Sequence, residues 1–156
     1  MWSGPVDRQR LLQRPMMWEE VAVPAVRGGQ TVTAQVRFAV SSEVCVVQVS
    51  SGGDVTARGE ARDLFAALAV ARRELEAHGM QLANNGARLD VWPSGMLRQA
   101  GYGRRAYVLT LPPTAARQST VDIFEPAPKS SVLGTVDEQR EWFRRYWDSV
   151  TRKEGS

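Results

Sequence analysis

The stretch that decides the fold is residues 31–49, TVTAQVRFAVSSEVCVVQV. Its first ten residues alternate between apolar and polar side chains, the period-two pattern of a strand with one buried face. A short polar turn follows at 41–43, and residues 44–49 are apolar on both faces, as in a strand at the centre of a sheet. The stretch therefore predicts a β-hairpin within a larger sheet.

Residues 60–78 carry the clearest helical pattern. Apolar side chains recur at spacings of three and four, while charged residues fill the opposite side. Gly79 is a stop signal just past the last turn, and His78 lies in that turn, where its charged form favours the helix dipole. The buried stripe is expected to be Leu64, Phe65, Leu68, Ala71, Arg72 and Leu75.

Further strands are expected after this helix. Residues 80–84 and 106–111 have the composition of strands, and residues 88–92 follow the Asn85-Gly86 step, a strong tight-turn signal. These pieces would extend the predicted sheet.

A connection and a second helix complete the predicted elements. Residues 112–134 are rich in proline, with Val121, Ile123 and Phe124 as expected anchors. Thr135 and Glu138 have the spacing of a capping box, which opens a helix over 135–150.

Residues 1–28 are expected to form an irregular N-terminal arm, because Pro5, Pro15 and Pro24 interrupt any long element. Its tryptophans and methionines are too apolar for a solvated tail. The arm therefore either docks on the domain or binds a partner.

A chain of 156 residues is one domain by size. We expect an α+β fold: an antiparallel sheet of about four to five strands, with one central helix and a C-terminal helix packed on it. In this reading residues 30–111 form the sheet and helix core, followed by the connection and the last helix.

Composition excludes several classes of protein. With 43% apolar and 24% charged residues the chain is globular in character, and no apolar run approaches the ~20 residues that cross a bilayer. One cysteine rules out an internal disulfide, and one histidine beside it makes a zinc site implausible. The start lacks the pattern of a signal peptide. We expect a cytoplasmic protein without a cofactor, a metal or a membrane partner.

Candidate catalytic groups are few. Cys45 lies among valines, where a thiol is usually a buried hydrophobe. His78 with Glu74 resembles a base and its orienting group, but a helix-end cap is the simpler role. Ser94 lies in a sharp turn that lacks the G-x-S-x-G pattern. No catalytic residue is predicted.

Residues 88–105, called here the basic segment, are the strongest binding signal. Residues 80–118 carry five basic and one acidic group, and Asp90 is expected to pair locally. Of the 20 basic residues in the chain 18 are arginine, which reflects either a GC-rich genome or a preference for phosphate, carboxylate or aromatic partners. The segment is either a solvated hairpin turn or a binding patch, with Arg88, Arg98, Tyr102, Arg104 and Arg105 as its candidate contacts.

The last helix adds a second set of candidates. Val136, Phe143, Trp147 and Val150 lie on one stripe that suits the core. Trp142, Arg145 and Tyr146 widen it with residue types that dominate protein interfaces. Core packing and partner binding are both open for this aromatic set.

Several short runs carry a family resemblance. They are Asp63 to Leu68, Arg72 to Glu76, Asn85 to Arg88, Val91 to Met96, Gly103 to Tyr107 and Thr135 to Arg140, with the Pro-Ser-Gly-Met turn the most specific. Over about 55% of its length the chain resembles a widespread set of small uncharacterised proteins from high-GC bacteria. In size and style it is also similar to immunity proteins that travel with secreted bacterial toxins. No functional residue is implied by either resemblance.

The sequence therefore favours a non-catalytic protein that binds another macromolecule. The sharpest form is an immunity protein that neutralises a toxin or effector encoded nearby. One alternative is a nucleic-acid (RNA or DNA) binding module that uses the basic segment, whose affinity would fall steeply with salt. Another is an enzyme of unrecognised type with a pocket around Asp90, Ser94 and Arg104.

Overall fold

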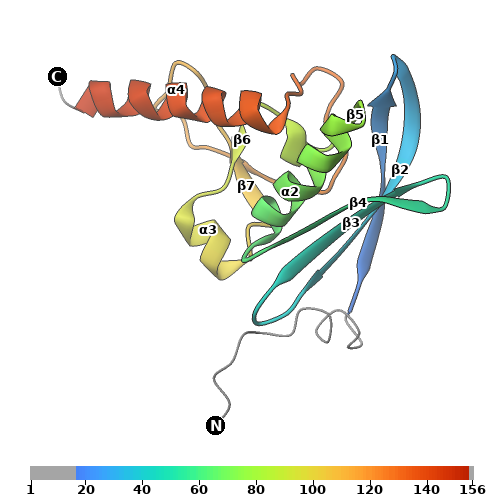
Figure 1. Ribbon diagram of the computed structural model, residues 1–156. Coiled ribbons are helices and arrows are strands. Elements are labelled where there is room, and N and C mark those ends of the chain that lie inside the picture. The colour runs from blue at the N-terminus through green and yellow to red at the C-terminus, as the bar shows by residue number, and fades with distance from the viewer. Residues whose placement is uncertain (1–16, 155–156) are drawn as a thin grey trace, which may run out of the picture.

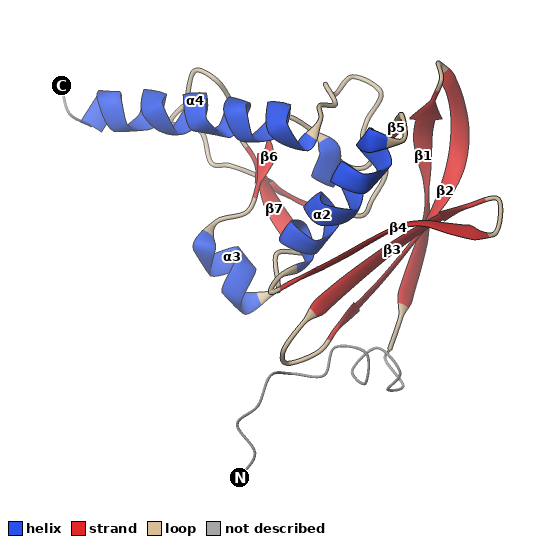
Figure 2. Ribbon diagram, viewed as in Figure 1, coloured by secondary structure: helices blue, strands red, loops and turns tan. Residues whose placement is uncertain are grey.

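The structure is a computed structural model that describes residues 17–154 (Figure 1). It is an α+β fold, as predicted, built on an antiparallel five-stranded sheet of order β4-β3-β2-β1-β5. A three-stranded antiparallel sheet of order β6-β7-β8 lies beside it (Figure 2). The strands of the larger sheet are β1 (Glu19–Arg27), β2 (Gln30–Val40), β3 (Cys45–Ser51), β4 (Asp54–Ala61) and β5 (Met80–Leu82). Those of the smaller sheet are β6 (Val91–Trp92), β7 (Arg105–Val108) and β8 (Thr120–Asp122).

The helices are α2 (Leu64–Ala77), α3 (Gly95–Ala100) and α4 (Val136–Glu154), with a 3-10 turn η1 at Asn85–Ala87. Helix α2 packs on β3, β4 and β5, and α4 contacts α2. Figure 1 shows α4 running along one side of the molecule, with its C-terminal half extending beyond α2.

The predicted hairpin is confirmed as β2 and β3. Val36 lies opposite Val49, and Phe38 lies opposite Val47, so these side chains share one face of the sheet. All four are buried in the core beneath α2 and the smaller sheet. Burial of apolar area of this kind is the main favourable term in folding.

Strand β1 corrects one expectation. Residues 19–27 are not irregular: they pair with β2 along their whole length, with Pro24 opposite Thr33. Val23 and Ala25 face the core, and the Pro24 carbonyl still accepts a hydrogen bond from the Ala83 amide, 2.8 Å away. Proline removes only its own N–H, so a strand near the sheet edge tolerates it. Most of the predicted arm, residues 1–16, lies outside the described residues.

Helix α2 begins later than predicted. Glu60 and Ala61 belong to β4, and the helix starts after Asp63, whose Oδ1 accepts a hydrogen bond of 2.8 Å from the Ala66 amide. That N-cap satisfies one of the free amides of the first turn. The predicted buried stripe is confirmed from Leu64 to Leu75. Close contact with β4 requires Gly59, since a Cβ there would lie 1.9 Å from the Ala67 carbonyl oxygen.

Strands β6 and β7 form within or close to the predicted strands 88–92 and 106–111, but together with β8 they make a second sheet instead of extending the first, and α3 was not expected. Helix α3 forms where a loop was predicted, with Ser94 as its N-cap, and β8 forms within the proline-rich connection. Ile123 and Phe124 anchor that connection as predicted, and Phe124 stacks on Phe38 with ring centroids 3.8 Å apart. This stack joins the two sheets.

Candidate binding surface

Three of the four arginines of the basic segment pair with carboxylates, most of which lie outside that segment. Arg88 pairs with Asp90, as predicted, at 3.0 Å. Arg98 pairs with Asp63 of the loop before α2, also at 3.0 Å. Arg104 contacts Asp122 at 3.0 Å and Glu19 at 2.6 Å. A ligand for these guanidinium groups must therefore share or displace an internal partner.

The candidate residues at the end of the segment contact different parts of the chain. The Arg105 side chain donates to the hydroxyl and carbonyl oxygens of Thr120, at 3.1 and 2.9 Å. Tyr102 has a φ of 56°, and its carbonyl accepts a 2.6 Å hydrogen bond from the Leu64 amide at the start of α2. Arg104 lies over the Phe38 ring, with its guanidinium carbon 4.9 Å from the centroid. The segment thus braces several elements rather than presenting one continuous patch.

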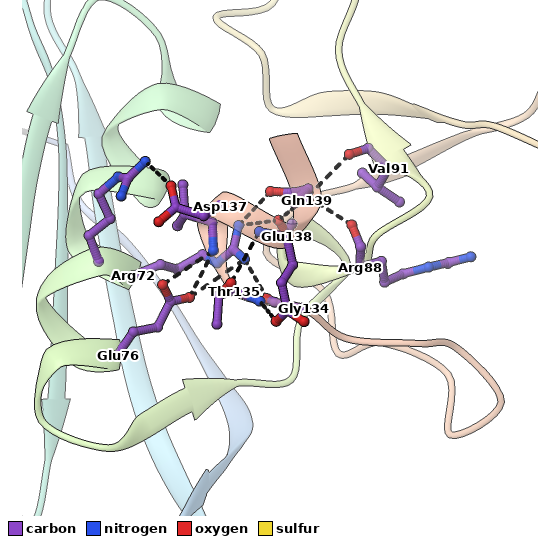
Figure 3. Close-up of polar contacts among 12 residues, drawn as sticks. Arg72, Glu76, Arg88, Val91, Gly134, Thr135, Asp137, Glu138 and Gln139 are labelled. Atoms are coloured by element: carbon purple, nitrogen blue, oxygen red, sulfur yellow. Dashed lines mark hydrogen bonds and ion pairs between the residues drawn. The ribbon is translucent and has the colours of Figure 1, made fainter. Parts of the chain in front are cut away.

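Helix α4 is anchored at its N-terminal end by a buried polar cluster (Figure 3). Arg72 of α2 donates to the Gln139 side chain at 2.7 Å, to the Gly86 carbonyl at 2.9 Å and to the Gly134 carbonyl at 2.8 Å. Gln139 in turn donates to three backbone carbonyls, those of Gly86, Arg88 and Val91. Burial lowers the pKa of Arg72 to about 10, so it is still charged at neutral pH.

Side chains from the start of α4 and from α2 cap the first turn of α4. The predicted capping box is confirmed: the Thr135 amide donates to Glu138 at 2.9 Å, and the Glu138 amide donates to the Thr135 hydroxyl at 3.1 Å. The Glu76 carboxylate accepts from the Val136 amide at 3.1 Å. These contacts fix where α4 starts and the direction in which it leaves the body.

Beyond this anchor the aromatic side chains of α4 become progressively exposed. Phe143 stacks on Trp92 of β6, with ring centroids 4.4 Å apart, and is half-buried. Trp142 and Tyr146 stack on each other and are also half-buried, and Tyr146 receives a hydrogen bond from Gln118. Trp147, expected on the core stripe, is 55% exposed, so this part of the stripe is not buried in the core.

Two open grooves run along one side of α4. The first, of about 440 Å³, brings Arg88 and Asp90 together with Trp142 and the exposed Val132. The second, of about 520 Å³, lies between Leu111-Pro112 and a helix face that carries Arg145, Asp148, Ser149 and Arg152. Leu111 lines both grooves.

A smaller pocket, called here the three-helix pocket, lies at the junction of α2, α3 and α4. Its volume is about 100 Å³. Arg98 of α3 and Arg140 of α4 are its charged side chains, and Gln139 is the other polar one. Phe65, Ala66, Ala69, Trp92 and Val136 complete the lining.

The candidate catalytic groups Cys45 and His78 have the structural surroundings that the sequence suggested. Burial, with the negative charge of Asp63 adding to it, raises the pKa of the Cys45 thiol to about 11. Such a thiol is a poor nucleophile at neutral pH. His78 is the C-cap of α2, as predicted, with Nδ1 2.8 Å from the Glu74 carbonyl oxygen.

The predicted enzyme pocket around Asp90, Ser94 and Arg104 would need these residues to converge, whereas each has a different partner. Asp90 pairs with Arg88, the Ser94 hydroxyl accepts from the Leu97 amide, and Arg104 pairs with Asp122 and Glu19. Within residues 17–154, no group of three His, Cys, Asp or Glu side chains is placed to hold a metal ion.

Sequence reasoning missed Arg140 and the three-helix pocket. The available signal was the spacing of Val136, Arg140, Phe143 and Trp147, which places all four on one stripe of a helix. That the other walls would come from Phe65, Trp92 and Arg98 depends on tertiary packing and has no local signature.

Comparison with protein-family models finds no match to the chain, and comparison with curated proteins finds none either. Among the described residues, no helix combines the length and the apolar character needed to cross a membrane.

Proposed function

We propose that this chain is a non-catalytic protein-binding domain that docks its partner through the aromatic side of α4. The sharpest form of the proposal is an immunity protein of the cytoplasm that neutralises a toxin or effector, in keeping with the family resemblance. The observation that carries it is the exposed Trp147 beside half-buried Phe143, on a helix that is firmly anchored at its other end.

Interface energetics support this choice of surface. Tryptophan, tyrosine and arginine dominate the hot spots of protein interfaces, and a rigid support reduces the entropy lost on binding. The ring centroids of Phe143 and Trp147 are 6.4 Å apart, and those of Phe143 and Tyr146 are 6.1 Å apart. A partner that covers Trp147 would extend this existing aromatic cluster and would bury apolar area at once.

Binding of nucleic acid through the basic segment has weaker support. Phosphate contacts need guanidinium groups that are free to release counterions. Arg88 and Arg104 each bind carboxylates of the same chain through two guanidinium nitrogens, and Arg98 does so through Nη1 alone. We therefore treat nucleic-acid binding as one outcome of the test below rather than as a second proposal.

The test is capture from the native host with the full chain as bait, after nuclease treatment, followed by mass spectrometry. We expect a stoichiometric protein that survives nuclease and is lost with Trp147→Ala. Val26→Ala is the matched control, because Val26 is also an exposed apolar residue but lies on β1. Loss of all bound material with nuclease, or equal capture by both variants and the wild type, would overturn the proposal.

A further inference from the structure

Among the grooves and pockets described above for residues 17–154, the three-helix pocket has the charge and size that best specify a ligand. Its two ionisable lining side chains, Arg98 and Arg140, are both arginines, and no carboxylate lines it. The wider grooves are different, since each contains an aspartate: Asp90 beside Arg88 in the first, and Asp148 beside Arg145 and Arg152 in the second. The three-helix pocket thus differs from both grooves in having no carboxylate in its lining.

Asp63 holds the Arg98 guanidinium in place, but it does not use all of its N–H donors. Only its Nη1 bonds to Asp63, at 3.2 Å to Oδ1 and 3.0 Å to Oδ2. Its Nε and Nη2 make no hydrogen bond with another described residue. The guanidinium carbon lies 5.2 Å from the Phe65 centroid and 5.7 Å from that of Trp92, so both aromatic rings contact the group. A second carboxylate would find free donors on a preorganised guanidinium.

Arg140 supplies the second donor. Its side chain makes no ion pair or hydrogen bond with another described residue, and it is exposed at the rim. The nearby Asp137 carboxylate is already bound by Arg73 at 2.7 Å. Arg98, Arg140 and Asp63 together carry one positive charge, which a single bound carboxylate would neutralise.

The volume limits what can enter. About 100 Å³ is room for roughly three water molecules. A carboxylate with an adjoining methylene fits within that volume. The apolar walls of Ala69, Val136 and Trp92 would contact the methylene, and the arginines would contact the oxygens.

We infer that the three-helix pocket receives an acidic side chain, aspartate or glutamate, of the partner protein. Trp147 lies on the same helix stripe as Arg140, two turns further along α4, so the neighbouring apolar residues of the partner would cover it. This inference rests on the proposed function and adds what the partner must carry. Charge complementarity would select a partner with an acidic side chain beside an apolar patch.

The test is a titration of the full ¹⁵N-labelled chain with N-acetylglutamate N-methylamide, followed by NMR. The probe presents one side-chain carboxylate and no other charge. We expect saturable shifts of the Arg98 and Arg140 Nε–H signals and of the Trp92 indole N–H. N-acetylglutamine N-methylamide, which has the same shape without the charge, should produce none.

Variants distinguish binding in the pocket from a general effect of the positive charge of α4. Arg140→Gln should weaken binding of the probe by about tenfold or more, because one charge-assisted contact is removed without uncovering a buried partner. Arg152→Gln, a loss of the same charge elsewhere on α4, should leave the affinity unchanged. The absence of any shift at the solubility limit of the probe would overturn the inference. So would equal affinity in the wild type and Arg140→Gln, or the same shifts with inorganic phosphate at equal ionic strength.

The two proposals can fail separately. If Trp147→Ala loses the captured protein and Arg140→Gln keeps it, docking on α4 stands and the acidic anchor is wrong. If the wild-type bait captures no protein, the proposed function is wrong, and a pocket that still binds the probe would be a small-molecule carboxylate site instead.

Discussion

The basic segment and helix α4 each carry four arginines, but the surroundings of these arginines differ. In the segment, Arg88, Arg98 and Arg104 each lie 3.0 Å from a carboxylate. On α4 only Arg144 pairs with another described side chain, Glu141, at 2.8 Å. The region with the greater excess of positive charge in the sequence is therefore the one whose charge is more fully neutralised in the fold.

The difference shows that local charge density is a poor guide to available charge. Apart from Asp90, the carboxylates that pair with the segment come from β1, from the loop before α2 and from the end of β8, and two of them are far away in sequence. Of the arginines of α4 only Arg144 has such a partner among the described residues, and the C-terminal half of the helix extends beyond α2 (Figure 1). A projecting helix keeps its donors free for a partner, at the cost of support from the core.

The largest expected effect is at Arg72, the arginine with the most internal partners. Arg72→Met should lower the free energy of unfolding by about 3–5 kcal/mol, because the Gly134 carbonyl and the Gln139 side-chain oxygen lose their donor inside the protein. Urea unfolding followed by circular dichroism measures this. The neighbouring Arg73→Met, which removes a surface pair, should cost less than about 1 kcal/mol. Equal losses in the two variants would mean that the buried cluster does not hold α4.

An intermediate effect is expected at Arg104, within the basic segment. Arg104→Ala should cost about 1 kcal/mol, since it removes two partly exposed ion pairs and the cover of the Phe38 ring. The midpoint of urea unfolding gives this value. No measurable loss would show that the paired arginines are as dispensable for stability as free ones, and the contrast with α4 would disappear.

The smallest effect on stability is expected at Arg145. Arg145→Ala should change the free energy of unfolding by less than about 0.5 kcal/mol, because the side chain is exposed and makes no ion pair with another described residue. Thermal unfolding beside Arg104→Ala provides the direct comparison. A loss at Arg145 larger than that at Arg104 would reverse the ranking and would assign the arginines of α4 a structural role.

Much of the fold followed from periodicity. The β2–β3 hairpin, the buried stripe of α2 and the capping box of α4 were all predicted, because each depends on side chains close together in sequence. Strand β1 was missed because Pro24 looked like a breaker, although the core needed only alternate positions such as Val23 and Ala25. Helix α3 and β8 were missed because they are short and lack a clear period.

The same distinction between local and long-range contacts applies to the candidate site. The sequence by itself determined the α+β class, the end of α2 and the capping box of α4, the apolar surroundings of Cys45 and the presence of arginine and aromatic side chains suited to an interface. Only the tertiary structure decided which of those arginines are available. Ion pairs such as Arg98–Asp63 and Arg104–Glu19 join residues far apart in sequence, and pockets form where separate elements meet. Electrostatic pairing depends on distance in space, so no local pattern could reveal that the free charge lies on α4 rather than in the basic segment.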